Sequence, residues 1–229
     1  MKAIVLAGGE GTRLRPLTRA TPKPLLPIAN RPFLEHQLSW LAGHGVTEVV
    51  LSLGYKSDAF AGRVFSDLPL QLATEPEPLG TAGAIRFAAE AGGVTSRFLV
   101  CNGDVLTDLD VSALVRFHEE REAEATIALT RVEDPSAFGV VPTDDEGRVL
   151  RFVEKPPPGT LDADTVNAGT YVLAPHVFDA FPGDGFSTKR STRPSGRQTT
   201  TPKLEVSATR VSARVASAPP SRCARTRSA

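Results

Sequence analysis

The chain has 229 residues, and its 26 lysines and arginines balance its 26 aspartates and glutamates. It is 41% hydrophobic and 23% charged, and no apolar run approaches the ~18 residues that a membrane span needs. Two cysteines and four unpaired histidines exclude a disulfide-rich secreted domain and argue against a zinc site. Because Gly8 interrupts the first apolar run too early for a signal peptide, we expect a cytoplasmic protein.

Predicted strands and helices alternate along most of the chain. In order they are strand 2–7, helix 33–42, strand 48–53, helix 57–65, strand 70–73, helix 80–91, strand 98–101, helix 111–122 and strand 126–132. This alternation predicts an α/β fold, a Rossmann-like doubly wound sheet that is mainly parallel. Strands then predominate, at 139–141, 149–154 and 170–173. We expect them to form a second lobe of the same domain, since no linker precedes them.

The zero net charge conceals an asymmetry between two parts of the chain. Ten basic side chains and only one acidic side chain lie in 187–229, which leaves a net charge of −9 for 1–186 and +9 for 187–229. The 187–229 segment has no aromatic residue and few large aliphatic ones. It cannot bury enough apolar surface to offset its ordering entropy, so we expect one folded domain over 1–186 and a disordered basic tail.

A glycine-rich loop follows the first predicted strand. Gly8, Gly9 and Gly11 free backbone N–H groups to approach a polyphosphate, and Thr12 and Arg13 follow at once. The third glycine of a dinucleotide fingerprint and the Gly-Lys-Ser/Thr of a P-loop are both missing. A purely structural turn is the alternative, although Arg13 offers a bidentate partner for a phosphate.

Lys23 lies between Pro22 and Pro24. The two prolines restrict the backbone and disfavour helix, which predicts that Lys23 projects from a stiff extended segment. A rigidly held cation after a phosphate-sized loop suits stabilisation of a transferring phosphoryl group. A solvated surface lysine is the alternative.

From this loop onward the sequence resembles a known family. GGEGTRLRPLTRATPKPLLPIANRPFLEHQL is similar to the N-terminal signature of sugar-phosphate nucleotidyltransferases, and EPLGTAGA, NGD, FGVV, FVEKP and NAGTYVL follow in the family's order. The resemblance implies transfer of a nucleotidyl group from a nucleoside triphosphate to a sugar 1-phosphate, with release of pyrophosphate. The members that use GTP and mannose 1-phosphate are the most similar.

Asp104 follows the predicted strand 98–101. Ligands of open α/β sheets bind at the carboxyl ends of strands, and Mg²⁺ bound to phosphates takes one or two protein carboxylates. Asp104 is therefore the candidate Mg²⁺ ligand, and the family resemblance implies the same role; a turn-forming aspartate is the alternative. With Arg13 and Lys23, it makes up the expected catalytic set.

Two further segments have roles that the resemblance implies. The segment that contains Glu75, Glu77 and Gly80 resembles the family's nucleobase site, where a carboxylate would accept from the guanine N1–H and N2–H₂ groups. This favours GTP slightly over TTP or UTP. The sugar-phosphate contacts implied by the resemblance are Gly139, Glu154, Lys155 and Asn167. Residues 154 and 155 would face opposite sides of a strand unless a twist at Pro156 brings them together.

The 187–229 segment departs from the family pattern. It contains no aspartate, although a later aspartate commonly completes the family's metal site, and its composition resembles a reading frame translated out of register. We therefore expect a truncated or frameshifted end. An inactive sugar-nucleotide-binding remnant and a glucose-1-phosphate thymidylyl- or uridylyltransferase remain alternatives. We expect no membrane partner, since no apolar run is long enough to span a bilayer, and no nucleic-acid partner, since the tail lacks aromatics for base stacking. A homo-oligomer is left open.

Overall fold

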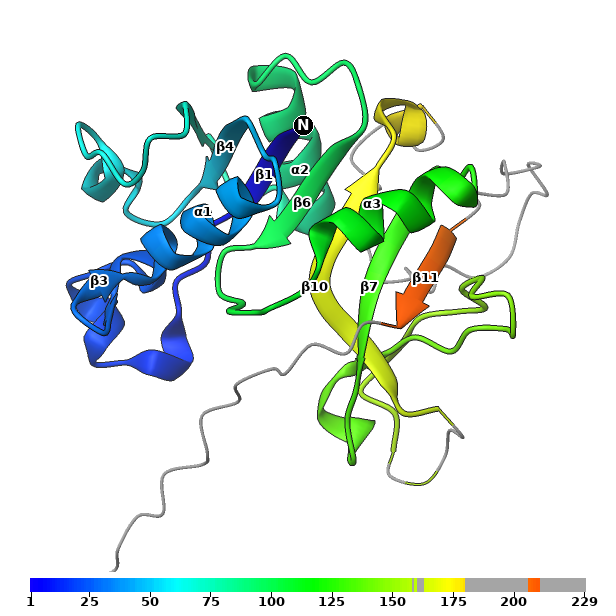
Figure 1. The fold of residues 1–229 in the computed structure, drawn as a ribbon. Helices are drawn as coiled ribbons and strands as arrows, with labels where there is room; N and C mark the ends of the chain where they lie inside the picture. Colours follow the sequence, from blue (N-terminus) through cyan, green and yellow to red (C-terminus); the bar gives the residue numbers. More distant parts are fainter. Residues whose placement is uncertain (158, 160–162, 180–205, 211–229) are drawn as a thin grey trace, which may run out of the picture.

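In the computed structural model, residues 1–157, 159, 163–179 and 206–210 are described. Nine strands of this part form one mixed sheet whose main path runs β11-β7-β10-β6-β1-β4-β5 (Figure 1). Their bounds are β1 Lys2–Leu6, β4 Glu48–Leu53, β5 Leu70–Thr74, β6 Phe98–Asn102, β7 Ala125–Arg131, β8 Gly139–Val140, β9 Val153–Glu154, β10 Thr165–Leu173 and β11 Val206–Arg210. A separate small ribbon pairs β2 (Pro27–Ile28) with β3 (Arg31–Pro32).

The sheet is parallel in its central part. β1 lies between β4 and β6 in parallel register, and β5 pairs in parallel with β4. β10 runs antiparallel to both β6 and β7, with an irregularity between Asn167 and Tyr171. β8 pairs with β10 and β9, which gives the predicted strand-rich lobe. The predicted doubly wound, mainly parallel α/β fold is confirmed.

Three α-helices cover the two faces of the sheet: α1 (Phe33–Gly43), α2 (Gly80–Ala91) and α3 (Val111–Glu120) (Figure 1). Successive side chains of β1 alternate between the faces, as strand geometry requires. Ala3 and Val5 belong to the core that α1 and α3 cover, whereas Ile4 belongs to the core under α2. Both faces are therefore apolar, which explains why the central strands are continuous hydrophobic runs. No helix of the described part combines the length and the apolar character that a bilayer crossing demands.

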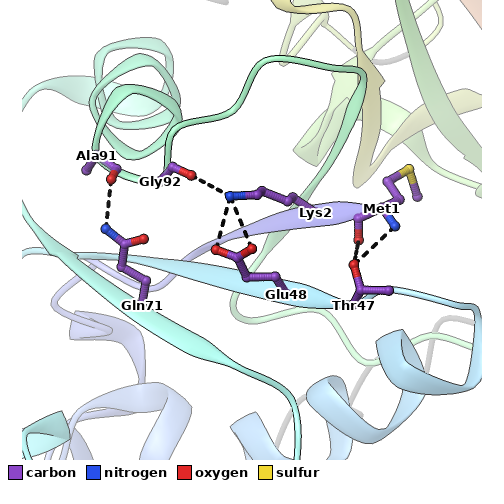
Figure 2. A network of polar contacts seen from close by, with 7 residues as sticks. All are labelled: Met1, Lys2, Thr47, Glu48, Gln71, Ala91 and Gly92. Carbon is purple, nitrogen blue, oxygen red and sulfur yellow. Dashed lines mark hydrogen bonds and ion pairs between the residues drawn. The ribbon is translucent and has the colours of Figure 1, made fainter.

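A polar network holds the end of α2 at the amino edge of the sheet (Figure 2). Lys2 Nζ lies 3.1 Å from each carboxylate oxygen of Glu48 and donates to the Gly92 carbonyl at 2.7 Å. Gln71 Nε2 donates to the Ala91 carbonyl, also at 2.7 Å. The last carbonyls of a helix lack partners within the helix, so Lys2 of β1 and Gln71 of β5 provide donors here, and Glu48 of β4 holds Lys2.

Three of the differences between prediction and structure concern the presence or length of whole elements. The predicted helix 57–65 is only a 3₁₀ turn, Ser57–Phe60, because the chain then extends and passes through Gly62 at φ +69°. The predicted strand 149–154 reduces to β9 and an isolated bridge between Thr143 and Val149.

The third difference is β11, which lies inside the segment expected to be disordered. Its backbone pairs in parallel with β7, from Val206 opposite Ala125 to Arg210 opposite Leu129. The composition of 187–229 did not predict this strand. Backbone pairing along an open strand edge stabilises a segment without large apolar side chains, which an argument from composition does not take into account. The other residues of 187–229 lie outside the described part.

Candidate active site

The candidate residues gather at one edge of the sheet. β1, β4, β5 and β6 are parallel, so their carboxyl ends lie together, and the loops that follow carry Gly8, Gly54, Glu75 and Asp104. β10 begins at this edge too, since Thr165 pairs with Arg131 at the carboxyl end of β7. This edge is where an open α/β sheet binds its ligands.

Two of these loops touch through glycines. A Cβ on Gly8 would lie 3.1 Å from the Gly54 nitrogen, and a Cβ on Gly54 would lie 3.0 Å from the Gly8 oxygen. The Tyr55 N–H donates to the same oxygen at 3.1 Å. Gly8 therefore has a structural reason to be glycine. Gly54 was not predicted from the sequence. The pattern that could have indicated it is a glycine directly after the buried strand β4.

The rest of the glycine-rich loop has an ordered turn and an open face. Gly11 has φ +61°, a conformation that favours glycine, and its carbonyl accepts from the buried Thr18 hydroxyl at 2.9 Å. Gly9 is exposed, and a Cβ there would meet nothing within 4 Å. Thr12 and Arg13 begin a 3₁₀ helix, Thr12–Leu14, and are exposed. Arg13 makes no ion pair with another described residue, so its guanidinium is available to an anion.

Lys23 does not lie in an extended segment, which corrects the sequence prediction. Lys23–Leu25 is a 3₁₀ helix that follows Pro22. Pro24 is compatible with this turn because the first residues of a helix need no N–H partner. Pro24 and Leu25 are buried, while the Lys23 side chain is partly exposed. Burial of Pro24 and Leu25, rather than extended backbone, therefore fixes the position of Lys23.

Lys23 and Asp104 form an ion pair although they lie 81 residues apart. Lys23 Nζ donates to Asp104 Oδ2 at 2.8 Å, and the two side chains are 31% and 51% exposed. Asp104 comes two residues after β6, where Gly103 N–H donates to the Leu6 carbonyl at 2.8 Å. The structure thus brings together two of the three predicted catalytic groups. The ammonium has two further N–H groups, so it can hold Asp104 and still reach a phosphate oxygen.

Asp104 is suitable as a magnesium ligand. Its carboxylate is half exposed at the strand end, and carboxylate oxygen is the donor type that Mg²⁺ prefers. Among the described residues, no group of three or more His, Cys, Asp or Glu side chains is arranged to hold a metal ion. Mg²⁺ bound to substrate phosphates takes only one or two protein carboxylates, so Asp104 alone fits that mode.

Glu75 and Glu77, the two candidates for the nucleobase, differ in their surroundings. Glu75 Oε1 accepts from the Ser52 hydroxyl and Oε2 from the Leu79 N–H, both at 3.1 Å. Glu75 therefore fixes the turn into α2, while Glu77 is exposed. Gly80 starts α2 with φ +69°. The role of Ser52 was not predicted. The pattern that could have indicated it is a serine in the otherwise apolar, buried part of β4.

Three of the four predicted sugar contacts, Gly139, Glu154 and Asn167, lie on neighbouring strands, and Lys155 directly follows β9. Gly139 pairs with Glu154 across β8 and β9, and a Cβ on Gly139 would lie 3.2 Å from Glu154 Oε2. Lys155 has φ +44° and its N–H donates to the Phe138 carbonyl at 2.9 Å, so the chain turns at Lys155, one residue before Pro156. This turn breaks the strand alternation that would have separated the Glu154 and Lys155 side chains.

Asn167 lies at the irregular part of β10. Its Nδ2 donates to the Tyr171 hydroxyl at 2.6 Å, and its Oδ1 accepts from the Gly169 N–H at 2.8 Å. A Cβ on Gly169 would lie only 2.7 Å from Asn102 Nδ2. The β10 motif is therefore in contact with Asn102 at the end of β6, two residues before Asp104.

Buried titratable groups near this edge do not look reactive. Burial raises the pKa of the Cys101 thiol to about 12, although a hydrogen bond with Thr170 opposes the shift. Burial also raises the pKa of the Tyr171 hydroxyl. Both groups stay protonated near neutral pH, so Cys101 is not a nucleophile. The site offers cations, a carboxylate and backbone N–H groups, which together suit a polyanionic substrate.

A family model described as Nucleotidyl transferase matches residues 2–214. The chain belongs to the nucleotidyl transferase family. The match covers every candidate residue described above and continues beyond residue 186, where the sequence predicts that the folded domain ends.

Two curated relatives support this membership. Mannose-1-phosphate guanylyltransferase of Mycobacterium tuberculosis is 45% identical over 202 residues, which cover 84% of this chain and 54% of that protein. Mannose-1-phosphate guanyltransferase beta-B of Xenopus laevis is 42% identical over 186 residues, which cover 78% of this chain and 51% of that protein. This chain, a member of the family, thus spans about half the length of these two relatives.

Solved structures share the fold. HddC from Yersinia pseudotuberculosis has a TM-score of 0.72 at 29% identity, with coverage of 93% of this chain and 91% of that chain. The same protein is also solved complexed with GMP-PN. A putative glucose-1-phosphate thymidylyltransferase from Bacillus anthracis has a TM-score of 0.73 at 24% identity, a likeness in fold alone, with coverage of 93% of this chain and 87% of that chain.

Proposed function

We propose that this chain transfers a nucleotidyl group from a nucleoside triphosphate to a sugar 1-phosphate, and that the substrates are GTP and mannose 1-phosphate. The observation that carries the proposal is the 2.8 Å pair of Lys23 with Asp104 beside the glycine-rich loop. A cation, a carboxylate and free backbone N–H groups are the parts that phosphoryl chemistry requires.

In the proposed reaction, a phosphate oxygen of the sugar 1-phosphate attacks the α-phosphorus of the nucleotide. A new P–O bond forms, the α–β P–O bond breaks, and pyrophosphate leaves with the bonding electrons. Lys23 and Arg13 neutralise negative charge on the phosphoryl oxygens, while the Gly8–Gly11 backbone positions the triphosphate. The attacking oxygen is already ionised near neutral pH, so no general base is needed.

Mg²⁺ on Asp104 is part of the proposal. The ion would supply charge neutralisation and orientation of the nucleotide phosphates. Asp104 would hold it with one carboxylate oxygen, while Lys23 keeps the carboxylate oriented.

The choice of GTP rests on the names of similar proteins and on one local feature. The two curated relatives are named for guanylyl transfer to mannose 1-phosphate. HddC is solved with GMP-PN, a name that includes the abbreviation of guanosine monophosphate. The exposed Glu77 carboxylate is an acceptor, and guanine presents N1–H and N2–H₂ donors. We propose a cytoplasmic location, where the Cys101 thiol stays reduced.

The deciding experiment is a panel of four nucleoside triphosphates against mannose 1-phosphate and glucose 1-phosphate, with pyrophosphate release as the readout. We expect turnover that depends on Mg²⁺ and is fastest with GTP and mannose 1-phosphate. Turnover with glucose 1-phosphate and TTP or UTP would keep the chemistry and change the substrates. Nucleotide binding without turnover in any combination would contradict the proposal and indicate a sugar-nucleotide-binding protein.

A further inference from the structure

Gln37 is a polar residue on the apolar face of α1. Helical spacing places it beside Phe33, Leu34, Leu38 and Leu41, all of which are buried, and Gln37 itself is 2% exposed. Burial of an amide costs free energy unless all of its hydrogen-bonding groups find partners. An apolar side chain of similar size would satisfy this position better if packing alone mattered.

The amide of Gln37 is only half satisfied. Its Nε2 donates to the Asn102 carbonyl at 2.9 Å, while its Oε1 has no hydrogen-bond partner among the described residues. The Asn102 carbonyl can only accept, so the orientation of the amide is determined. A buried acceptor without a donor is destabilising, which makes stability a poor explanation for a glutamine here.

The bond from Gln37 holds the backbone that leads to Asp104. Asn102 ends β6 and Asp104 follows two residues later. Gly103 between them donates to the Leu6 carbonyl, so the strand end is held by β1 on one side and by α1 on the other. The same helix supports Lys23, because Leu25 of the Lys23–Leu25 turn belongs to one buried cluster with Leu34 and Leu38.

We infer that Gln37 is a positioning residue for nucleotidyl transfer: from the core, it fixes the Asn102 carbonyl and so sets Asp104 at the right distance from Lys23. This inference rests on the proposed function, since it assigns a purpose to the geometry of that site. Gln37 touches no substrate. Its effect is transmitted through the backbone of Asn102 and Gly103.

The variant Gln37→Met keeps the length of the side chain and removes both amide groups. We expect the midpoint of thermal unfolding to stay the same or rise, because the unpaired acceptor is lost. We expect kcat to fall about tenfold or more, since small displacements of catalytic groups are costly, and the Mg²⁺ concentration for half-maximal rate to rise. KM for either substrate should change less than about twofold, because the misplaced groups act mainly on charge that develops in the transition state.

Gln71→Met is the matched control. Gln71 Nε2 also donates to a backbone carbonyl, that of Ala91 at 2.7 Å, at the opposite edge of the sheet (Figure 2). Loss of this bond should leave kcat and the Mg²⁺ dependence unchanged. A purely structural role of Gln37 would lower the unfolding midpoint in Gln37→Met and leave the kcat of the folded fraction intact, which would overturn the inference.

Hydrogen exchange separates this inference from the proposed function. In Gln37→Met without substrates, we expect the Gly103 amide to exchange about tenfold faster than in the unmutated chain, while amides in the middle of β1 and β4 keep their rates. An unchanged Gly103 rate overturns the inference whether or not the chain is active. Absence of turnover in the unmutated chain refutes the proposed function, and the exchange rate still decides whether Gln37 holds the strand end.

Discussion

At the residue scale, the candidate site depends on a few side chains that the chain brings together over long sequence distances. Lys23 comes from the segment before α1 and Asp104 from the end of β6, and they meet at 2.8 Å. Both are partly exposed, so the pair itself contributes at most about 1 kcal/mol to stability. Its importance therefore lies in where it places an ammonium group and a carboxylate.

Removal of the ammonium tests this interpretation. For Lys23→Ala we expect the rate of nucleotidyl transfer to fall about 10²- to 10³-fold, because charge on the phosphoryl oxygens is no longer neutralised, with little change in the unfolding midpoint. Steady-state kinetics and thermal denaturation check both parts. Arg97→Ala, which breaks an exposed ion pair with Glu119 away from the site, is the control and should keep normal kinetics. Near-normal activity of Lys23→Ala would rule out the role.

Gly9 and Gly103 distinguish a glycine needed by a ligand from one needed by the fold. A Cβ at Gly9 meets nothing within 4 Å, whereas one at Gly103 would lie 2.5 Å from the Leu6 oxygen. We expect Gly9→Ala to change the free energy of unfolding by less than about 0.5 kcal/mol, but to raise KM for the triphosphate about tenfold through contact with the phosphates. Gly103→Ala should destabilise the chain. Equal KM values for Gly9→Ala and the unmutated chain would show that the triphosphate stays clear of Gly9.

At the element scale, packing between neighbours decides which predicted elements form. α1, α2 and α3 form within a residue or two of their predicted bounds because each buries an apolar face against the sheet. The predicted helix 57–65 ends after one 3₁₀ turn. β10 extends five residues before the predicted start at 170, since both β7 and β8 offer it backbone partners.

The contact between α3 and β7 predicts a pH dependence of stability. His118 is 5% exposed, and its Nδ1 lies 2.9 Å from the Thr126 hydroxyl. Burial, helped by Arg97, lowers the pKa of His118 below 6.5 in the folded chain. The unfolded chain therefore binds more protons, and the stabilisation that is complete above pH ~6.5 is lost as the pH falls through the window between the two pKa values.

Chemical denaturation at a series of pH values measures this effect. Between about pH 7 and pH 5 we expect the free energy of unfolding to fall more steeply for the unmutated chain than for His118→Asn, which does not titrate in this range. His36→Asn is the control, because it leaves the buried His118 in place; the His36 Nε2–H on α1 donates to the Ile28 carbonyl, and this variant should keep the steep slope. Parallel curves for His118→Asn and the unmutated chain would contradict the assignment.

At the scale of the whole molecule, the mixed sheet joins the part that carries the predicted nucleotide contacts to the part that carries the predicted sugar contacts. The parallel strands β1, β4, β5 and β6 carry the glycine-rich loop, Glu75 and Asp104, and β8, β9 and β10 carry the predicted sugar contacts. β10 connects the halves by lying antiparallel between β6 and β7. β11 continues the sheet beyond β7, which is the edge that the 187–229 segment covers in part.

Deletion of residues 187–229 tests whether β11 matters to the domain. We expect the unfolding midpoint to fall by about 3 °C or more and aggregation to increase, because the β7 edge loses its partner strand. Light scattering and thermal denaturation measure these effects. An unchanged midpoint would mean that β11 contributes nothing to stability. Salt-sensitive retention on DNA that disappears with the deletion would instead support a nucleic-acid role for the basic segment.

Much of this site was predictable residue by residue. The glycine-rich loop, Lys23, Asp104 and the Glu154–Lys155 pair are each visible as local patterns, and their order along the chain carries the family resemblance. Gln37, Ser52 and Gly54 were not predicted, because their importance comes from partners 65, 23 and 46 residues away in the sequence. The extended conformation expected around Lys23 was wrong, since burial of Pro24 and Leu25 favours a 3₁₀ turn.

The sequence by itself determined the fold class and the chemical types present at the site, because hydrophobic periodicity and turn-forming residues act locally. Only the tertiary structure decided that Lys23 reaches Asp104 and that a strand forms within the basic segment. It also decided that the Glu75 carboxylate accepts hydrogen bonds from the Ser52 hydroxyl and the Leu79 N–H. These outcomes depend on which strand edges and loops become neighbours. Such neighbours are chosen by the packing of the whole sheet, and no single segment of the chain contains that information.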